Sequence, residues 1–193
     1  KGLGGNLSAY EVMWKNFYEV ITKTGSNHTP PLPGSHNYYV LIETSGADQK
    51  KDLDHFEKLL EMGLENKMIK DVIIAQSESD RKKLWAIRDD VEQHYQEGPV
   101  KMFDVSMPIS EMENYVLEVN KRFSCIWDNY KCVVFGHVGD GNLHLIGGVG
   151  TDNVDEIHAM EECIYEPLKP ISGAVSAEHG IGLEKKNYLN ISR

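Results

Sequence analysis

The stretch Gly136-His-Val-Gly-Asp-Gly-Asn-Leu-His144 joins an apolar segment at 131–135 to the segment 142–149, and it holds three glycines within six residues. Glycine adopts backbone conformations that other residues avoid, so this stretch predicts a tight turn between two strands. His137 and His144 stand at the two ends of the turn and would return to a common point. We therefore expect the fold to present two imidazoles from one strand pair.

Apolar periodicity on either side of this turn predicts a series of strands and helices. Strands are predicted at 37–44, 69–76 and 100–107, and helices at 49–67, 77–96, 110–123 and 154–166. Ser77 with Asp80 suits the first turn of one helix, and Ser110 with Glu113 could form a capping box on another. For residues 9–21, a helix capped by Ser8 and Glu11 and a strand running into a helix fit about equally well.

The remaining segments complete an α+β pattern. Residues 25–36 hold three of the seven prolines and predict an exposed connector, and residues 172–182 predict a glycine-containing loop. Strands that alternate with helices favour an antiparallel or mixed sheet covered by helices largely on one side, an elaborated ferredoxin-like arrangement. At 193 residues the whole chain fits one domain.

Composition excludes several classes of function. The formal net charge of -10 disfavours nucleic acid and anionic membrane surfaces, and the sequence has neither a membrane-spanning apolar run nor a signal-peptide core. Three cysteines without a Cys-x-x-Cys pair fit a reducing compartment, the cytoplasm or the mitochondrial matrix, and we expect all three to be buried thiols. The chain begins without Met, which indicates an excised piece of a longer protein.

A second motif, Ala177-Glu-His-Gly-Ile-Gly182, supplies what the histidine pair lacks. A catalytic Zn²⁺ site takes three protein ligands and keeps one position open. Glu178 can be the third ligand beside His137 and His144, while His179 stays free to move protons. A His-x6-His pair alone is usually coincidental, but the glycine-rich setting and this second cluster favour a metal site.

The motifs FGHVGDGNLHL at 135–145 and SAEHGIG at 176–182 together resemble the C-terminal domain of the FAD-linked oxidase family. That family contains D-lactate dehydrogenase, D-2-hydroxyglutarate dehydrogenase and the glycolate oxidase flavin subunit. The resemblance begins near Leu7, runs to the end of the chain, and includes LWAIR at 84–88 and VKMFDVSMP at 100–108.

The resemblance implies an FAD-dependent 2-hydroxy-acid dehydrogenase, and the motifs carry its site residues over. His137, His144 and Glu178 match the metal ligands, for Zn or Mn, and His179 matches the general base. Arg88 and Lys101 match the cations that hold the substrate carboxylate. On spacing alone, Arg88 fits an ion pair with Glu92 about equally well, and Lys101 better fits an outward-facing strand charge. FAD itself would be held mainly by an N-terminal domain outside this chain, so the isolated fragment should be inactive.

Two loop residues and two departures from the family pattern bear on the substrate. Asn142 is a candidate substrate contact, whereas Asp140 is expected mainly to stabilise the turn. The 2-hydroxyglutarate type has Asn where this chain has Ile146, and a hydroxyl residue where it has Glu92. Both changes remove groups suited to a second carboxylate, so we expect a D-2-hydroxy acid of the lactate or glycolate type.

Two alternatives remain open beside the dehydrogenase. A non-catalytic assembly domain of a multi-subunit glycolate oxidase-like complex would keep the fold without binding a metal, and a metal hydrolase would use the same three ligands with activated water. The dehydrogenase needs an electron acceptor as a partner, and the sequence is compatible with a homo-oligomer.

Overall fold

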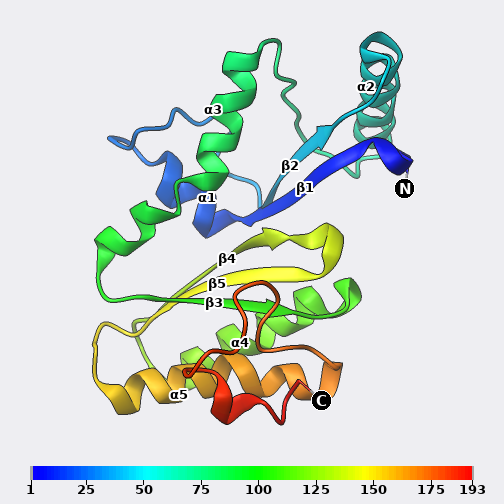
Figure 1. The fold of residues 1–193 in the computed structure, drawn as a ribbon. Helices are drawn as coiled ribbons and strands as arrows, with labels where there is room; N and C mark the ends of the chain where they lie inside the picture. The colour runs from blue at the N-terminus through cyan, green and yellow to red at the C-terminus, as the bar shows by residue number, and fades with distance from the viewer. Residues whose placement is uncertain (1, 193) are drawn as a thin grey trace. The chain divides into compact units, whose positions relative to one another are not determined.

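The computed structural model describes residues 2–192, apart from the side chain of residue 97. The chain divides into two compact units, Lys1–Asp90 and Val91–Arg193. Each unit combines antiparallel strands with helices, so the predicted α+β class is confirmed (Figure 1).

The first unit contains an antiparallel strand pair and three helices. Strands β1 (Leu7–Trp14) and β2 (Tyr38–Thr44) pair so that Val12 lies opposite Val40. Helix α1 (Lys15–Thr22) follows β1 directly and is joined later by α2 (Gln49–Glu65) and α3 (Glu78–Asp89). Residues 9–21 are therefore a strand that runs into a helix, and the core side chains of α1 are Phe17, Tyr18 and Ile21.

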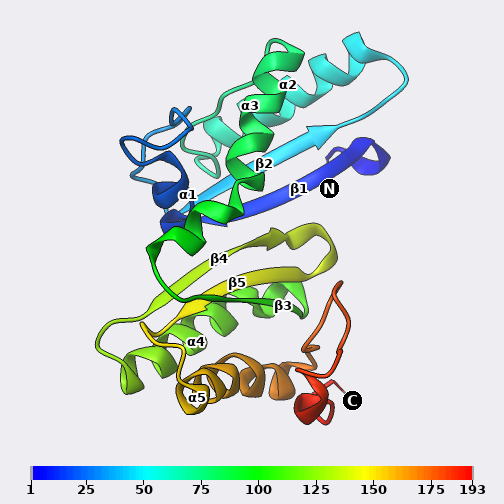
Figure 2. The same cartoon turned by 60° about the vertical axis from the view of Figure 1, so that its left-hand side comes forward.

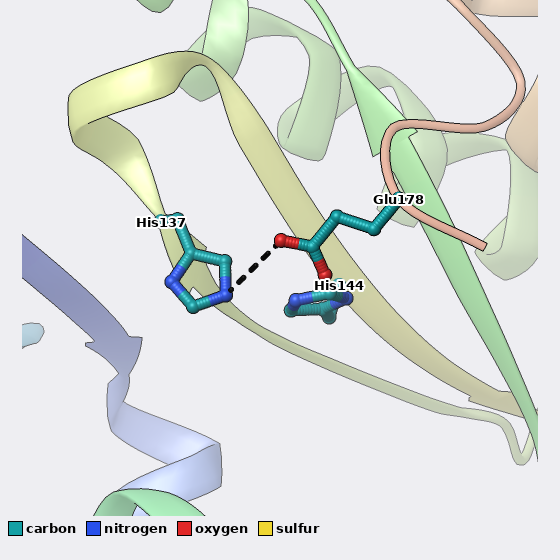
Figure 3. Close-up of side chains that lie close together, drawn as sticks. All are labelled: His137, His144 and Glu178. Atoms are coloured by element: carbon teal, nitrogen blue, oxygen red, sulfur yellow. Dashed lines mark ion pairs between the residues drawn. The ribbon is translucent and has the colours of Figure 1, made fainter.

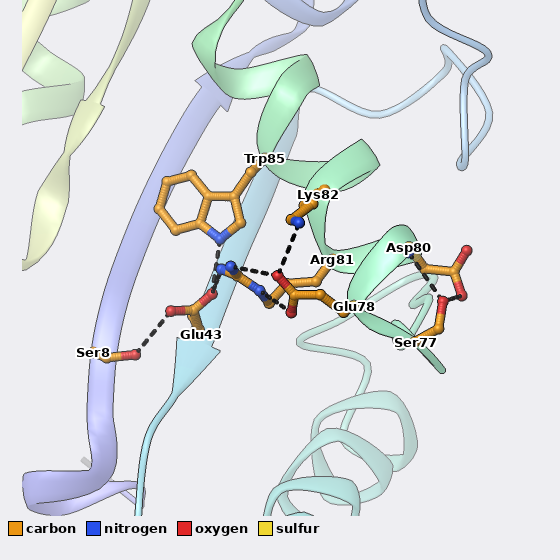
Figure 4. A network of polar contacts seen from close by, with 8 residues as sticks. All are labelled: Ser8, Glu43, Ser77, Glu78, Asp80, Arg81, Lys82 and Trp85. Carbon is orange, nitrogen blue, oxygen red and sulfur yellow. Dashed lines mark hydrogen bonds and ion pairs between the residues drawn. The ribbon is translucent and has the colours of Figure 1, made fainter.

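A polar network joins the end of β2 to α3 (Figure 4). One carboxylate oxygen of Glu43 accepts hydrogen bonds from the Trp85 indole at 2.8 Å and from Arg81 at 2.7 Å. The hydrogen bond from Trp85, against a smaller opposing effect of burial and together with Arg81, lowers the pKa of Glu43. Ser77 caps α3 as predicted, because its hydroxyl accepts from the Asp80 backbone N–H at 3.1 Å.

The second unit is built on a three-stranded antiparallel sheet. Strand β5 (Asn142–Gly148) lies between β4 (Lys131–His137) and β3 (Lys101–Ser106). Helices α4 (Met112–Ile126) and α5 (Val154–Tyr165) both cover one face of this sheet (Figures 1 and 2). On that face Phe103 is fully buried, and its ring lies 5.6 Å from that of Tyr165 on α5.

Short 3₁₀ turns connect or flank these elements. They are η1 (Gly4–Asn6), η2 (Val91–Glu97), η3 (Ile109–Glu111), η4 (Val138–Asp140), η5 (Glu166–Ile171) and η6 (Lys186–Tyr188). Among the described residues, each helix is either too short or too polar to cross a lipid bilayer.

The predicted strand at 69–76 is wrong. The backbone N–H of Val72 donates to the side chain of Asp71 at 2.8 Å, and Ile73 is 48% exposed. A strand needs both a backbone partner and a buried face, and this segment shows neither at these positions. It is an irregular connection between α2 and α3.

Two helix starts or ends also differ from the prediction. The helix predicted at 77–96 stops at Asp89, and Asp90 leaves the helical conformation with its carboxylate 2.8 Å from His28. The helix predicted from Ser110 begins at Met112 instead, because Ser110 lies in a 3₁₀ turn in which the Glu111 N–H donates to the Pro108 carbonyl.

The prediction that all three cysteines are buried is wrong for one of them. Cys132 and Cys163 are buried, and burial raises the pKa of Cys132 to about 12. Cys125 is exposed near the end of α4, on the side of the helix that points away from its buried residues.

Candidate functional site

The turn between β4 and β5 is as tight as its glycines predict. Gly141 has a φ of +84°, and a methyl group there would lie 2.7 Å from the Met107 carbonyl oxygen. A methyl group at Gly136 would lie 2.6 Å from the Asn142 carbonyl oxygen. Larger residues would force the backbone apart at both positions, so the glycines allow the two histidine-bearing strands to close on each other.

His137, His144 and Glu178 form one cluster (Figure 3). Each side chain offers a donor atom, and these atoms all lie within 4.8 Å of one another. Within the cluster, His137 Nε2 lies 3.5 Å from Glu178 Oε1. The hairpin and the distant 172–182 loop thus bring together the three residues that the sequence singled out as ligands.

The cluster fits a divalent cation. Ligands about 2.1 Å from a tetrahedral centre are about 3.4 Å apart, which is close to the His137–Glu178 separation. Two imidazoles and one carboxylate are also a common ligand set of catalytic zinc sites. The His144 side chain is only 7% exposed, whereas those of His137 and Glu178 are 32% and 48% exposed, so solvent reaches the cluster through His137 and Glu178.

The loop that carries Glu178 is held by Asp104, a residue that the sequence reasoning did not single out. Asp104 lies on β3 directly opposite His144 of β5, and it is 1% exposed. Its Oδ2 accepts hydrogen bonds from the backbone N–H groups of Glu178 and His179, both at 2.9 Å. Burial alone would raise the pKa of Asp104, but these N–H donors and the nearby cations lower it overall.

A signal for Asp104 was present in the sequence. It is the single acidic residue in the otherwise apolar centre of the predicted strand 100–107. A carboxylate buried in a strand is costly unless it has partners, so such a position points to a local polar structure. The partner loop lies more than seventy residues away, and one strand alone does not identify it.

His179 follows Glu178 and lies near the cluster. Its ring centroid is 6.2 Å from that of His144, with 26° between the planes. The residue is exposed, which suits a group that must exchange protons with a substrate and then with solvent.

The two candidate carboxylate-binding cations are both engaged in ion pairs. Arg88, on α3 of the first unit, donates from Nε to Glu11 at 2.8 Å, and its side chain is 11% exposed. Lys101, on β3 of the second unit, contacts Glu161 at 2.8 Å and Glu184 at 3.0 Å. The partners in these ion pairs are Glu11, Glu161 and Glu184, which are not members of the cluster.

Asn142 is buried beside the histidines. It begins β5 two residues before His144, so both side chains point to the same face of the sheet. It is 3% exposed, and neither polar atom of its side chain has a hydrogen-bond partner among residues 2–192. A buried amide of this kind usually has a partner, which makes it a candidate contact for a bound molecule. Asp140 lies exposed in η4 within the turn.

The fold of the second unit and its two motifs, the histidine hairpin and the Glu-His loop, point to one protein family. The family model of the FAD linked oxidases, C-terminal domain, matches residues 2–193, and the chain belongs to this family.

Relatives in this family are named for oxidation of 2-hydroxy acids. A mitochondrial D-2-hydroxyglutarate dehydrogenase of Arabidopsis thaliana is 32% identical over 100% of this chain and 34% of its own length. A mitochondrial protein of Schizosaccharomyces pombe, provisionally named as a D-lactate dehydrogenase, is 34% identical over 97% of the chain and 37% of its length. A D-2-hydroxyglutarate–pyruvate transhydrogenase of Saccharomyces cerevisiae is 32% identical over 97% and 39%. The chain therefore spans about a third of the length of these curated relatives.

Proposed function

We propose that this chain is the substrate- and metal-binding part of an FAD-dependent dehydrogenase that oxidises a small D-2-hydroxy acid to the 2-oxo acid. The observation that carries the proposal is the convergence of His137, His144 and Glu178 with their donor atoms within 4.8 Å, beside the exposed His179. Membership of the FAD-linked oxidase family supports the flavin as the redox partner.

In the proposed reaction each group has a separate task. His137, His144 and Glu178 would hold a divalent cation, which would supply the Lewis acidity that lowers the pKa of the substrate hydroxyl. FAD, held mainly outside this chain, would accept the C2 hydrogen with its electron pair. His179 takes the hydroxyl proton, so the C2–O bond becomes a carbonyl as the C–H and O–H bonds break. Asn142 offers an amide to the substrate from the same face of the sheet as His144.

We assign substrate carboxylate binding to Arg88 and Lys101. Arg88 presents a planar fork suited to a carboxylate, and Lys101 presents a point charge. Both side chains already bind carboxylates, Glu11 and Glu161 respectively, which supports their ability to hold such a group. For either residue to hold substrate, it must share or exchange its present partner.

The proposed substrate has one carboxylate, as in lactate or glycolate. Ile146 is fully buried two residues after His144, and it therefore presents an apolar side chain to the same sheet face. That side chain cannot form a hydrogen bond with a second carboxylate. The relatives carry names of both kinds, D-lactate and D-2-hydroxyglutarate enzymes. The mitochondrial relatives support a mitochondrial location.

Metal stoichiometry of the full-length protein tests the core of this proposal. We expect about one Zn²⁺ or Mn²⁺ per chain, and a loss of that metal in His137→Ala. His158→Ala is the matched control, because His158 lies on α5 of the same unit and contacts Glu161 and Glu162. Full-length protein that binds no divalent metal would instead support the non-catalytic assembly domain.

A further inference from the structure

One carboxylate, that of Asp104, connects the two segments that carry the candidate ligands. Its Oδ2 accepts from three consecutive backbone N–H groups, those of Ala177 at 3.1 Å and of Glu178 and His179 at 2.9 Å. The Ser176 hydroxyl lies 3.2 Å from the same oxygen. One buried carboxylate oxygen of β3 therefore accepts from three consecutive backbone N–H groups of the loop that presents Glu178 and His179.

The other oxygen of this carboxylate faces the hairpin. Asp104 and His144 are direct cross-strand partners, and Asp104 Oδ1 lies 4.0 Å from His144 Nδ1. This distance is longer than a hydrogen bond. Oδ1 is buried, and no hydrogen-bond partner for it exists in the described part of the chain. A buried carboxylate oxygen without a donor is costly, which points to a partner that it gains in another state.

Metal chemistry supplies a reason for that partner. A histidine that binds a metal through one ring nitrogen usually donates its other N–H to a carboxylate or carbonyl oxygen, which fixes the tautomer. A shift of about 1 Å would bring His144 Nδ1 within reach of Asp104 Oδ1.

We propose that Asp104 is a positioning residue of the site, with a different task for each oxygen. Oδ2 holds the Glu178–His179 backbone in place, and Oδ1 accepts a hydrogen bond from His144 Nδ1–H when a cation binds, which leaves Nε2 for the ion. The second half of this inference rests on the proposed function, and the first half does not.

The loop has a second attachment, which makes the proposal testable by substitution. Lys185 donates from Nζ to the Ser176 hydroxyl at 3.2 Å and to the Asp104 backbone carbonyl at 3.4 Å. Neither contact uses the Asp104 side chain, so variants at position 104 retain this attachment.

The test uses the full-length protein with Asp104→Ala and Asp104→Asn. Val105→Ala is the control, because Val105 is fully buried next along β3 and points to the opposite face of the sheet. Two quantities are measured: amide hydrogen exchange at 177–179 without metal, and the affinity for Zn²⁺ alone.

Asp104→Ala should lose protection at the three amides and bind Zn²⁺ about 10- to 100-fold more weakly. Asp104→Asn can keep an acceptor oxygen toward the loop but turns an NH₂ group toward His144. It should retain most of the amide protection and still bind Zn²⁺ about 10-fold more weakly. Val105→Ala should leave both quantities near those of the unsubstituted protein.

Each half of the inference can be overturned separately. Full amide protection in Asp104→Ala would remove the role of Oδ2, and unchanged Zn²⁺ affinity in Asp104→Asn would remove that of Oδ1. Unsubstituted protein that binds no Zn²⁺ would defeat the proposed function together with the Oδ1 half. The exchange measurement needs no metal and decides the Oδ2 half in either case.

Discussion

His179 and its neighbour Glu178 have different surroundings, which suit one to proton transfer and the other to metal binding. Glu178 points its carboxylate at His137, whereas the His179 ring lies beside that of His144 and is exposed. A general base contributes about 10²- to 10⁴-fold to a rate, since it removes a proton as the transition state forms. The residue can therefore be tested without disturbing the ligands.

We predict that His179→Ala lowers kcat of the full-length enzyme by about 10²- to 10⁴-fold while its FAD content and bound metal stay unchanged. Steady-state kinetics with a dye acceptor, flavin absorbance and metal analysis check this. A variant that turns over normally would assign the proton to another group, and one that loses its metal would place His179 among the ligands.

At the level of single residues, the sequence identified the three members of the cluster because each lies in a short motif of unusual composition. His137 and His144 flank a glycine turn, and Glu178 precedes a histidine and a glycine. Its place as an acidic residue in an apolar strand marked Asp104 as unusual, but the sequence does not identify its partners, which are backbone N–H groups of a distant loop. The partner of Arg88, Glu11, was missed for a similar reason, since 77 positions separate the two residues.

Among the elements, the β4–turn–β5 hairpin sets the positions of two candidate ligands. Gly141 occupies the left-handed region, and its space is closed by the Met107 carbonyl. We predict that Gly141→Ala destabilises the protein by about 1–3 kcal/mol, because it adds both backbone strain and a close contact. Urea unfolding measures this loss.

Gly34→Ala is the control for the turn. Gly34 has no atom within 4 Å of the place of an added methyl group and no positive φ. The stability of this variant should stay the same or rise slightly, because alanine lowers the conformational entropy of the unfolded chain. Equal effects of the two substitutions would contradict the steric account of the turn.

The β2–α3 network makes the free energy of unfolding depend on pH in the acidic range. The pKa of Glu43 is below its ordinary value of 4.5, so the folded state favours the ionised carboxylate. The stabilising contribution is complete above about pH 4.5 and is lost as the pH falls through the folded-state pKa.

We predict that Glu43→Gln costs about 1 kcal/mol at pH 7 and has a smaller effect near pH 3. Urea midpoints at the two pH values measure the difference. Glu19→Gln removes an exposed i,i+4 pair with Lys15 and should change stability by less than about 0.5 kcal/mol at either pH. An equal cost of Glu43→Gln at both pH values would contradict the role of the charge.

The order of strands and helices was largely predictable, and the failures have local causes. Residues 69–76 have the apolar content of a strand, but strand formation depends on a neighbour that the sequence does not reveal. The helix predicted to reach residue 96 ends at Asp89, and Asp90 lies 2.8 Å from His28, a residue 62 positions earlier in the chain. Periodicity describes a local preference and does not reveal such distant contacts.

For the whole molecule, the proposed substrate preference follows from one residue of the sheet. The proposed preference for a monocarboxylate depends on Ile146 replacing a polar residue on the His144 face of the sheet. We predict that the full-length enzyme, supplied with FAD and a dye acceptor, has a higher kcat/KM for D-lactate or glycolate than for D-2-hydroxyglutarate.

A panel of D- and L-2-hydroxy acids checks this preference. Loss of a hydrogen-bond partner for one substrate carboxylate typically costs about 10- to 100-fold in kcat/KM, which sets the size of the difference expected. Equal or faster turnover of D-2-hydroxyglutarate would defeat the preference while leaving the hydroxy-acid reaction intact.

The three candidate ligands lie on different kinds of backbone. Two lie on a paired hairpin, and the third lies on a loop attached through Asp104. We therefore expect a bound ion to lose its contact with the Glu178 carboxylate first, while the two imidazoles keep their positions. Chelators should act by capturing this half-released form, and stripped protein should be nicked by proteases near residues 176–182 sooner than anywhere in the hairpin.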